Sequence, residues 1–112
     1  QHAEPCVTIE LARVHEAAEQ LGVSRKEREK RLRLRFAEVA VHPTTGELWL
    51  LSGVDRLLLV VGRDGAVRGM HFFSKKQQPQ PEALAFLPDG RLAIASEGPK
   101  GPAVLGLYAP AR

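Results

Sequence analysis

Two short apolar runs joined by a polar turn dominate the last third of the chain. Residues 83–87 form the first run, residues 88–90 read Pro-Asp-Gly, and residues 92–95 form the second run. Asp-Gly between apolar runs is typical of a β-hairpin, because glycine adopts the positive φ that the turn needs. This stretch therefore predicts two antiparallel strands joined by a tight turn.

A second copy of this hairpin pattern lies upstream, where residues 37–53 read AEVAVHPTTGELWLLSG. Pro43 matches Pro88 at an offset of 45 residues, and Leu48 matches Leu92 at an offset of 44 residues. A repeat of this length with a hairpin in each copy is the signature of β-propeller blades. The chain is therefore expected to contain two related units.

Each unit is expected to be an antiparallel meander. Apolar runs predict four strands in the first unit and three in the second: residues 39–41, 48–51, 57–61, 66–73, 83–87, 92–95 and 104–108. The runs LWLL and LLLVV do not alternate with polar residues, so both faces of these strands should be buried, as in stacked blades. We therefore expect an all-β fold of propeller-type blades, each a four-stranded antiparallel meander, with a short N-terminal helical insertion. Because propellers have about 4–8 blades, the chain is expected to be a fragment or to associate with copies of itself.

The N-terminal part has a different pattern. Residues 6–11 read CVTIEL and predict a strand, because they are rich in β-branched side chains. Four apolar residues then share one face of a predicted helix: Val14, Ala17, Ala18 and Leu21. Ser24 and Glu27 fit a capping box, which predicts a second short helical turn.

The expected organisation follows from these patterns. Residues 1–35 form an N-terminal strand, helix and basic connection, residues 36–80 form a first blade, and residues 81–112 form a second, incomplete blade.

The single cysteine, Cys6, excludes an internal disulfide framework and a cysteine-based zinc cluster. No run approaches the roughly 20 apolar residues of a membrane-spanning helix. The net charge of +3 demands neither a nucleic-acid nor a membrane partner.

The basic charge is concentrated in residues 25–35, which contain seven Lys or Arg residues and two Glu residues. Leu32, Leu34 and Phe36 alternate with arginines there, which predicts an edge strand or an extended segment with one solvent-exposed face. This segment is interpreted as a solvated connection. The alternative is a phosphate or nucleic-acid contact, although no aromatic side chains are interleaved for base stacking.

Glu82 and Glu97 are the candidate metal ligands. In a propeller blade the first strand lines the central channel, and its start lies at the same end as the end of the second strand. Glu82 occupies the first of these places and Glu97 the second, so their carboxylates could converge on a calcium ion. The alternative is a pair of solvated loop carboxylates, since Ala37 and Gly53 stand at the matching positions of the first unit.

The residues carry no pattern that identifies a catalytic site. Neither a His-x-x-His or His-Glu-x-x-His spacing nor a Gly-x-Ser-x-Gly elbow occurs. His42 precedes a proline in a predicted turn, and Trp49 and Phe86 are expected to pack between blades.

Residues 36–108 resemble the C-terminal part of the SdiA-regulated family of bacterial propeller proteins. The segments AVHPTTGELWLLS, LLLVVGRDGAV, QPEALAFLPDGRLAIASEG and LGLY carry the resemblance. The chain is similar, more distantly, to NHL-repeat, gluconolactonase-like and phytase-like propellers. Glu38 and Val39 depart from the family pattern, which has small residues there, and Ala93 stands where the family favours an aromatic residue.

The resemblance implies a non-catalytic binding or scaffold module in the bacterial periplasm or cell envelope. The rival expectation is a calcium-dependent hydrolase of the phosphoesterase or lactonase type found among related propellers. A third, nucleic-acid contact, rests on residues 25–35 alone. The expected partners are the missing blades of the same propeller or further copies of the chain.

Overall fold

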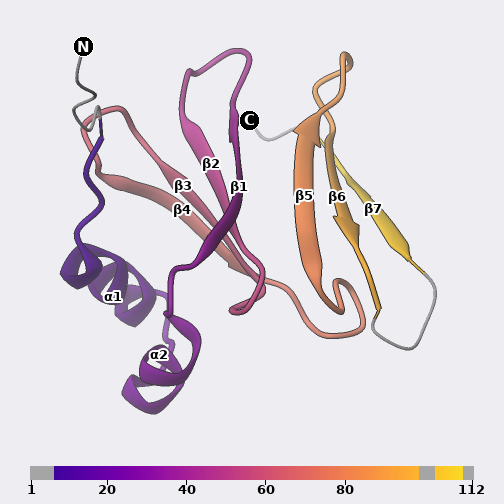
Figure 1. The fold of residues 1–112 in the computed structure, drawn as a ribbon. Coiled ribbons are helices and arrows are strands. Elements are labelled where there is room, and N and C mark those ends of the chain that lie inside the picture. The colour runs from indigo at the N-terminus through magenta and orange to yellow at the C-terminus, as the bar shows by residue number, and fades with distance from the viewer. Residues whose placement is uncertain (1–6, 99–102, 110–112) are drawn as a thin grey trace, which may run out of the picture.

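The computed structural model describes residues 7–98 and 103–109. Within these residues the chain forms two antiparallel sheets and two short helices (Figure 1). The first sheet has the order β1-β2-β3-β4: β1 (Phe36–Val41), β2 (Leu48–Ser52), β3 (Leu57–Val61) and β4 (Val67–Phe72). The second has the order β5-β6-β7: β5 (Pro81–Phe86), β6 (Leu92–Ser96) and β7 (Val104–Tyr108). The helices precede both sheets: α1 (Leu11–Gln20) and α2 (Arg25–Arg31). The fold is therefore mostly β, and the strands predicted for both units are confirmed.

The tight turns predicted at the two Asp-Gly pairs are also confirmed. Gly65 has a φ of 82° and Gly90 a φ of 90°. In the β5–β6 turn the Leu87 N–H donates to the Arg91 carbonyl at 2.8 Å, which leaves a three-residue loop between the paired residues. A glycine in the left-handed region commonly ends such a loop, because it lacks the Cβ that would be strained there.

The two sheets have the same register at their first hairpin. Val41 pairs with Leu48 in the first sheet, and Phe86 pairs with Leu92 in the second. In each sheet a β-bulge interrupts the first strand near its start. Leu48 and Leu92 therefore occupy equivalent positions, as the sequence repeat predicts.

The sheets pack face to face, with β1 and β5 side by side (Figure 1). Buried hydrophobic residues from both sheets fill the space between them: Trp49, Leu51, Leu58, Phe73, Leu84, Leu92 and Ile94. The rings of Trp49 and Phe86 meet edge to face with their centroids 5.1 Å apart, so both pack between the sheets as expected. This cluster joins the two sheets into one unit.

The N-terminal part of the chain covers the opposite face of the first sheet over β2, β3 and β4, while Val39 and Val41 of β1 stay about half exposed on that face. Val14 and Ala18 of α1 are fully buried against Leu50, Leu59 and other residues of that face. The predicted capping box is present in part, because the Ser24 hydroxyl accepts a hydrogen bond from the Glu27 N–H at 3.2 Å. The predicted apolar face is confirmed at Val14 and Ala18 and is wrong at Leu21, which follows the end of α1 and is 61% exposed.

One expectation for the N-terminal region is wrong. Residues 7–10 form no strand, and α1 begins at Leu11 inside the segment where a strand was expected; Cys6 lies outside the described residues. The backbone carbonyl of Thr8 lies against the turn glycine Gly65, so this segment passes over the end of a hairpin. Of the two alternatives for residues 32–35, the edge strand is not formed, and β1 begins at Phe36. A β-propensity pattern without a neighbouring strand to pair with does not make a strand.

The outer face of the second sheet is apolar and open to solvent. Two rows of paired residues form it: Ala83, Ala95 and Leu105, and Ala85, Ala93 and Leu107. The two leucines are 66% and 49% exposed, respectively. No helix within the described residues is long and apolar enough to cross a membrane.

Candidate functional site

An open groove of about 450 Å³ lies where four segments meet at one end of the two sheets. These segments are the connection into β1, the β2–β3 turn, the loop between β4 and β5, and the start of β5. Its walls include Arg33, Arg35, Arg56, Pro79 and Glu82. The groove therefore combines residues from the basic segment with the predicted metal ligand Glu82.

The buried carboxylate of Asp55 fixes the backbone at this groove. The Asp55 side chain accepts hydrogen bonds from the Arg33 N–H at 3.1 Å, the Leu34 N–H at 2.8 Å and the Ser52 hydroxyl at 2.8 Å. Asp55 is only 2% exposed, so these three donors replace the water that its charge would otherwise need. They also hold Leu34 at a φ of 52°, a left-handed conformation unusual for leucine. The sequence analysis missed this role, because an isolated Asp in a turn gives no signal of burial.

Two other arginines tie the loops around the groove together. Arg56 donates from Nε and Nη2 to the Pro79 carbonyl at 3.2 and 3.0 Å, which joins the β2–β3 turn to the loop before β5. Arg31 donates from Nη2 to the Asp55 carbonyl at 3.0 Å, and its guanidinium lies 4.7 Å from the centroid of the Phe72 ring. These contacts give part of the basic segment a structural role.

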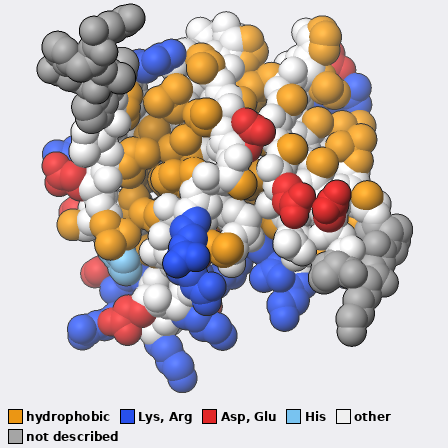
Figure 2. All heavy atoms as spheres, viewed as in Figure 1, with side chains coloured by type: hydrophobic (Ala, Val, Ile, Leu, Met, Phe, Trp, Pro, Cys, Tyr) orange, Lys and Arg blue, Asp and Glu red, His pale blue; other side chains and the backbone are white. Residues whose placement is uncertain are grey.

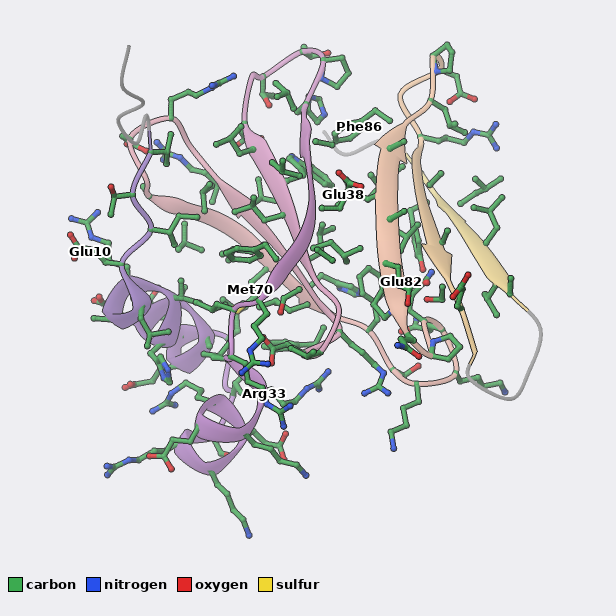
Figure 3. All side chains as sticks on the ribbon, in the orientation of Figure 1. Glu10, Arg33, Glu38, Met70, Glu82 and Phe86 are labelled. Carbon is green, nitrogen blue, oxygen red and sulfur yellow. The ribbon has the colours of Figure 1, made fainter. Side chains whose placement is uncertain are left out.

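Arg33 and Arg35 differ from those two arginines. Both are exposed, and neither side chain makes a hydrogen bond or ion pair with any residue in the described part of the chain. A second hollow of about 460 Å³ shares Arg33 and Arg56 with the groove and adds Lys30 and Lys75 to its lining. Figure 2 shows the Lys and Arg side chains gathered at this end of the molecule, and Figure 3 places Arg33 there. The groove thus opens onto a basic surface with free guanidinium groups.

Glu82 and Glu97 lie at the same end of the second sheet. Pro81 pairs with Ser96, Glu82 stands in the bulge that follows, and the Glu97 N–H donates to the Gln80 carbonyl at 3.2 Å. Both carboxylates are exposed, and Figure 3 shows Glu82 beside β5. Residues 7–98 and 103–109 contain no group of three or more His, Cys, Asp or Glu side chains that could hold a metal ion. The calcium role of these two residues stays a prediction.

A buried glutamine supports the groove from within the second sheet. Gln78 is fully buried, and its Nε2 donates to the Tyr108 hydroxyl at 2.7 Å while its Oε1 accepts from the Ser96 hydroxyl. These bonds fasten the loop before β5 to β6 and β7. The sequence analysis interpreted SKKQQPQP as a polar loop, since composition cannot distinguish one buried glutamine from its exposed neighbours.

His42 lies at the far end of β1 from the groove, and its side chain stabilises the β1–β2 turn. Its Nδ1 accepts hydrogen bonds from the Thr44 and Thr45 N–H groups at 3.1 and 3.2 Å. Its ring packs edge to face on the Phe86 ring, with the two ring centroids 5.0 Å apart. The interpretation of His42 as a turn residue is confirmed.

The turn aspartates also lie away from the groove, and their pKa values are lowered. For Asp64 the main cause is the hydrogen bond from the Ala66 N–H, helped by the charge of Arg68. For Asp89 it is the hydrogen bond from the Arg91 N–H, helped by the Arg91 side chain. In both cases a donor stabilises the ionised carboxylate more than the neutral acid.

Comparisons with protein-family models, with curated proteins and with solved structures gave no match to this chain. The resemblance to the SdiA-regulated family therefore stays a prediction.

Proposed function

We propose that the chain is a non-catalytic binding module of the bacterial SdiA-regulated propeller type, located in the cell envelope, which holds its ligand in the groove at the strand ends. The carrying observation is that the groove draws its walls from both sheets, while the side chains of Arg33 and Arg35 have no partner among residues 7–98 and 103–109. Propeller ligands bind where loops from several blades converge on one end. The groove has that position in both repeats, because β1 and β5 both start beside it.

The blade assignment rests on the equivalence of the two sheets. They share register and bulge position, and their first strands lie side by side, as the inner strands of neighbouring blades do. The outer face of the second sheet corresponds in the repeat to the face of the first sheet that packs against its neighbour. Ala85 on the outer face matches Ala40, for example, and Ala95 matches Leu51. A further blade, or another copy of the chain, is therefore the proposed partner of that face.

Ligand mapping tests the binding role. Amide chemical shifts of the ¹⁵N-labelled chain are recorded against a panel of sugars, nucleotides, peptides and metal ions, and the same mixtures are analysed for products. We expect at least one class to shift resonances of the groove residues without being consumed. Ligands that shift only residues elsewhere would contradict the groove as the site, and steady turnover would contradict the non-catalytic role.

A calcium-dependent hydrolase is the second candidate. The observation in its favour is that Glu82 and Glu97 stand at one end of the same sheet, and that Glu82 also lines the groove. A calcium ion held there would polarise a phosphate ester or lactone bound beside the arginines. Release of product from such substrates, dependent on calcium and lost in Glu82→Gln, would favour this candidate over the binding module.

A further inference from the structure

We propose that the ligand of the groove is a small sugar phosphate, with its phosphate on Arg33 and Arg35 and its hydroxyl groups toward Glu82. This inference rests on the proposed binding role and adds the chemical class of the ligand. Four features of the groove support it. They are the positive charge of its lining, the absence of partners for Arg33 and Arg35 among the described residues, the hydrogen-bonded backbone around them, and the side chains that form its walls.

The charge of the site favours an anion. The groove and the adjoining hollow are lined by six basic residues and two acidic residues. The basic residues are Lys30, Arg31, Arg33, Arg35, Arg56 and Lys75. A concave surface lined by one sign of charge concentrates ions of the opposite sign. The groove therefore attracts a negatively charged group.

The free guanidinium groups favour phosphate in particular. Arg33 and Arg35 have no partner among the described residues, whereas Arg31 and Arg56 are committed to backbone carbonyls. A guanidinium presents a planar fork of N–H donors that matches two oxygens of a phosphate group. Both forks come from the connection into β1 and line the same groove, so together they can offer one phosphate several charge-assisted hydrogen bonds.

The backbone that carries these arginines is already ordered. Asp55 holds the N–H groups of Arg33 and Leu34, and Arg56 holds the opposite loop at Pro79. A ligand that binds here orders two side chains but little backbone, so less of its binding free energy is lost to entropy. The hydrogen bonds of Asp55 and Arg56 thus preorganise the groove, which favours binding of a ligand of low molecular mass.

The walls distinguish a sugar phosphate from a nucleic acid. A volume of about 450 Å³ suits a small molecule. The groove wall contains no aromatic side chain on which a base could stack, and Phe73 beside the adjoining hollow is only 2% exposed. Glu82 adds a carboxylate that accepts hydrogen bonds from hydroxyl groups but repels a second phosphate. One phosphate and several hydroxyls match this arrangement.

Calorimetric titration of the full chain with glucose 6-phosphate, inorganic phosphate, glucose and a single-stranded RNA tests the inference. We expect glucose 6-phosphate to bind more tightly than phosphate or glucose alone. Arg33→Gln with Arg35→Gln should weaken its binding by at least about tenfold, since it removes the charged hydrogen bonds. Arg33→Lys with Arg35→Lys should give an intermediate loss, because it keeps the charge and removes the fork. The matched control, Arg13→Gln with Lys26→Gln, lowers the net charge equally at exposed positions outside both hollows and should change binding less than about twofold.

Each other outcome has a distinct meaning. Equal losses in the glutamine pair and the control pair would overturn the site, because net charge alone would explain binding. Tight RNA binding with a steep salt dependence would overturn the ligand class in favour of nucleic acid. If no sugar phosphate binds but another ligand from the mapping panel shifts the groove residues, this inference fails while the binding role stands. If nothing shifts them, both fail.

Discussion

At the scale of single residues, Asp55 is the side chain on which the groove most depends. It is buried, and it accepts hydrogen bonds from two partly buried backbone N–H groups and from the buried hydroxyl of Ser52. Such a residue affects stability mainly through the groups that its removal would leave without partners. Its effect should therefore exceed that of any exposed carboxylate.

We expect Asp55→Ala to lower the free energy of unfolding by about 3 kcal/mol, because one buried and two partly buried donors lose their acceptor. Urea denaturation followed by circular dichroism measures this change. Glu38→Ala, which removes an exposed carboxylate from β1, is the matched control and should cost less than about 0.5 kcal/mol. Similar midpoints for the two variants would show that the Asp55 contacts contribute little.

The turn glycine Gly90 gives a second expectation at this scale. Its φ of 90° strains a β-branched residue, so Gly90→Val should destabilise the fold by about 1 kcal/mol or more. Gly90→Asn is the control, because asparagine tolerates the left-handed region better than other residues. Thermal melting compares the two, and a valine variant as stable as the asparagine variant would contradict the assigned turn.

Asp64 and Asp89 give an expectation for pH. Their pKa values are lowered in the folded chain, so the folded state binds fewer protons than the unfolded state near the carboxyl pKa. The stability they contribute is complete above the unfolded pKa of about 3.9 and is lost as pH falls through the lower folded values. Titration of their carboxyl carbon shifts by NMR should give midpoints below about 3.9, the value of an unperturbed Asp. Midpoints at or above about 3.9 would refute the turn hydrogen bonds as the cause.

At the scale of elements, hairpins could be predicted from sequence and single contacts could not. The strands around Asp89-Gly90 can be predicted from local sequence, because the Asp-Gly pair predicts a turn and the apolar runs on either side predict paired strands. The expected strand at residues 6–11 was wrong because pairing depends on distant neighbours. The basic segment is visible in the sequence, but which of its arginines bind the protein depends on remote loops, as Arg31 shows by donating to the Asp55 carbonyl. Gln78 could not be found for the same reason.

The placement of Glu82 and Glu97 on β5 and after β6 yields the calcium prediction. If these carboxylates hold calcium, the ion stabilises the folded chain by mass action, by about 2.7 kcal/mol at a concentration 100 times the Kd. Calcium should then raise the melting temperature of the unmodified chain and leave Glu82→Gln with Glu97→Gln unchanged. Equal responses in both proteins, including no response in either, would remove these residues as metal ligands.

At the scale of the whole molecule, the two sheets differ in how much of their apolar surface is covered. The inter-sheet cluster and α1 bury β2 and β3 on both faces. Val39 and Val41 of β1 stay 52% and 50% exposed, and the alanine and leucine rows of the second sheet face solvent. An open apolar face of a β-sheet favours association. The proposed propeller architecture explains this asymmetry, because the next blade would cover that face.

We therefore expect the chain to self-associate as its concentration rises, as measured by light scattering after size-exclusion chromatography. Leu105→Ser with Leu107→Ser should shift the protein toward the monomer, since these two leucines are the largest residues of the open face. Leu21→Ser is the control, because Leu21 is 61% exposed beside α1, away from that face. A monomer at every concentration of the unmodified chain would exclude further copies as the partner.

The way Asp55 holds the groove has a consequence for how such a site can diversify. The Asp55 carboxylate accepts hydrogen bonds from the main-chain N–H groups of residues 33 and 34, not from their side chains. Any non-proline residue at position 33 offers the same donor, so the chemistry displayed there can change while the scaffold keeps its geometry. Selectivity and foldability are thus encoded by separate positions. A library randomised at positions 33 and 35 alone should retain mostly folded members with altered ligand preference.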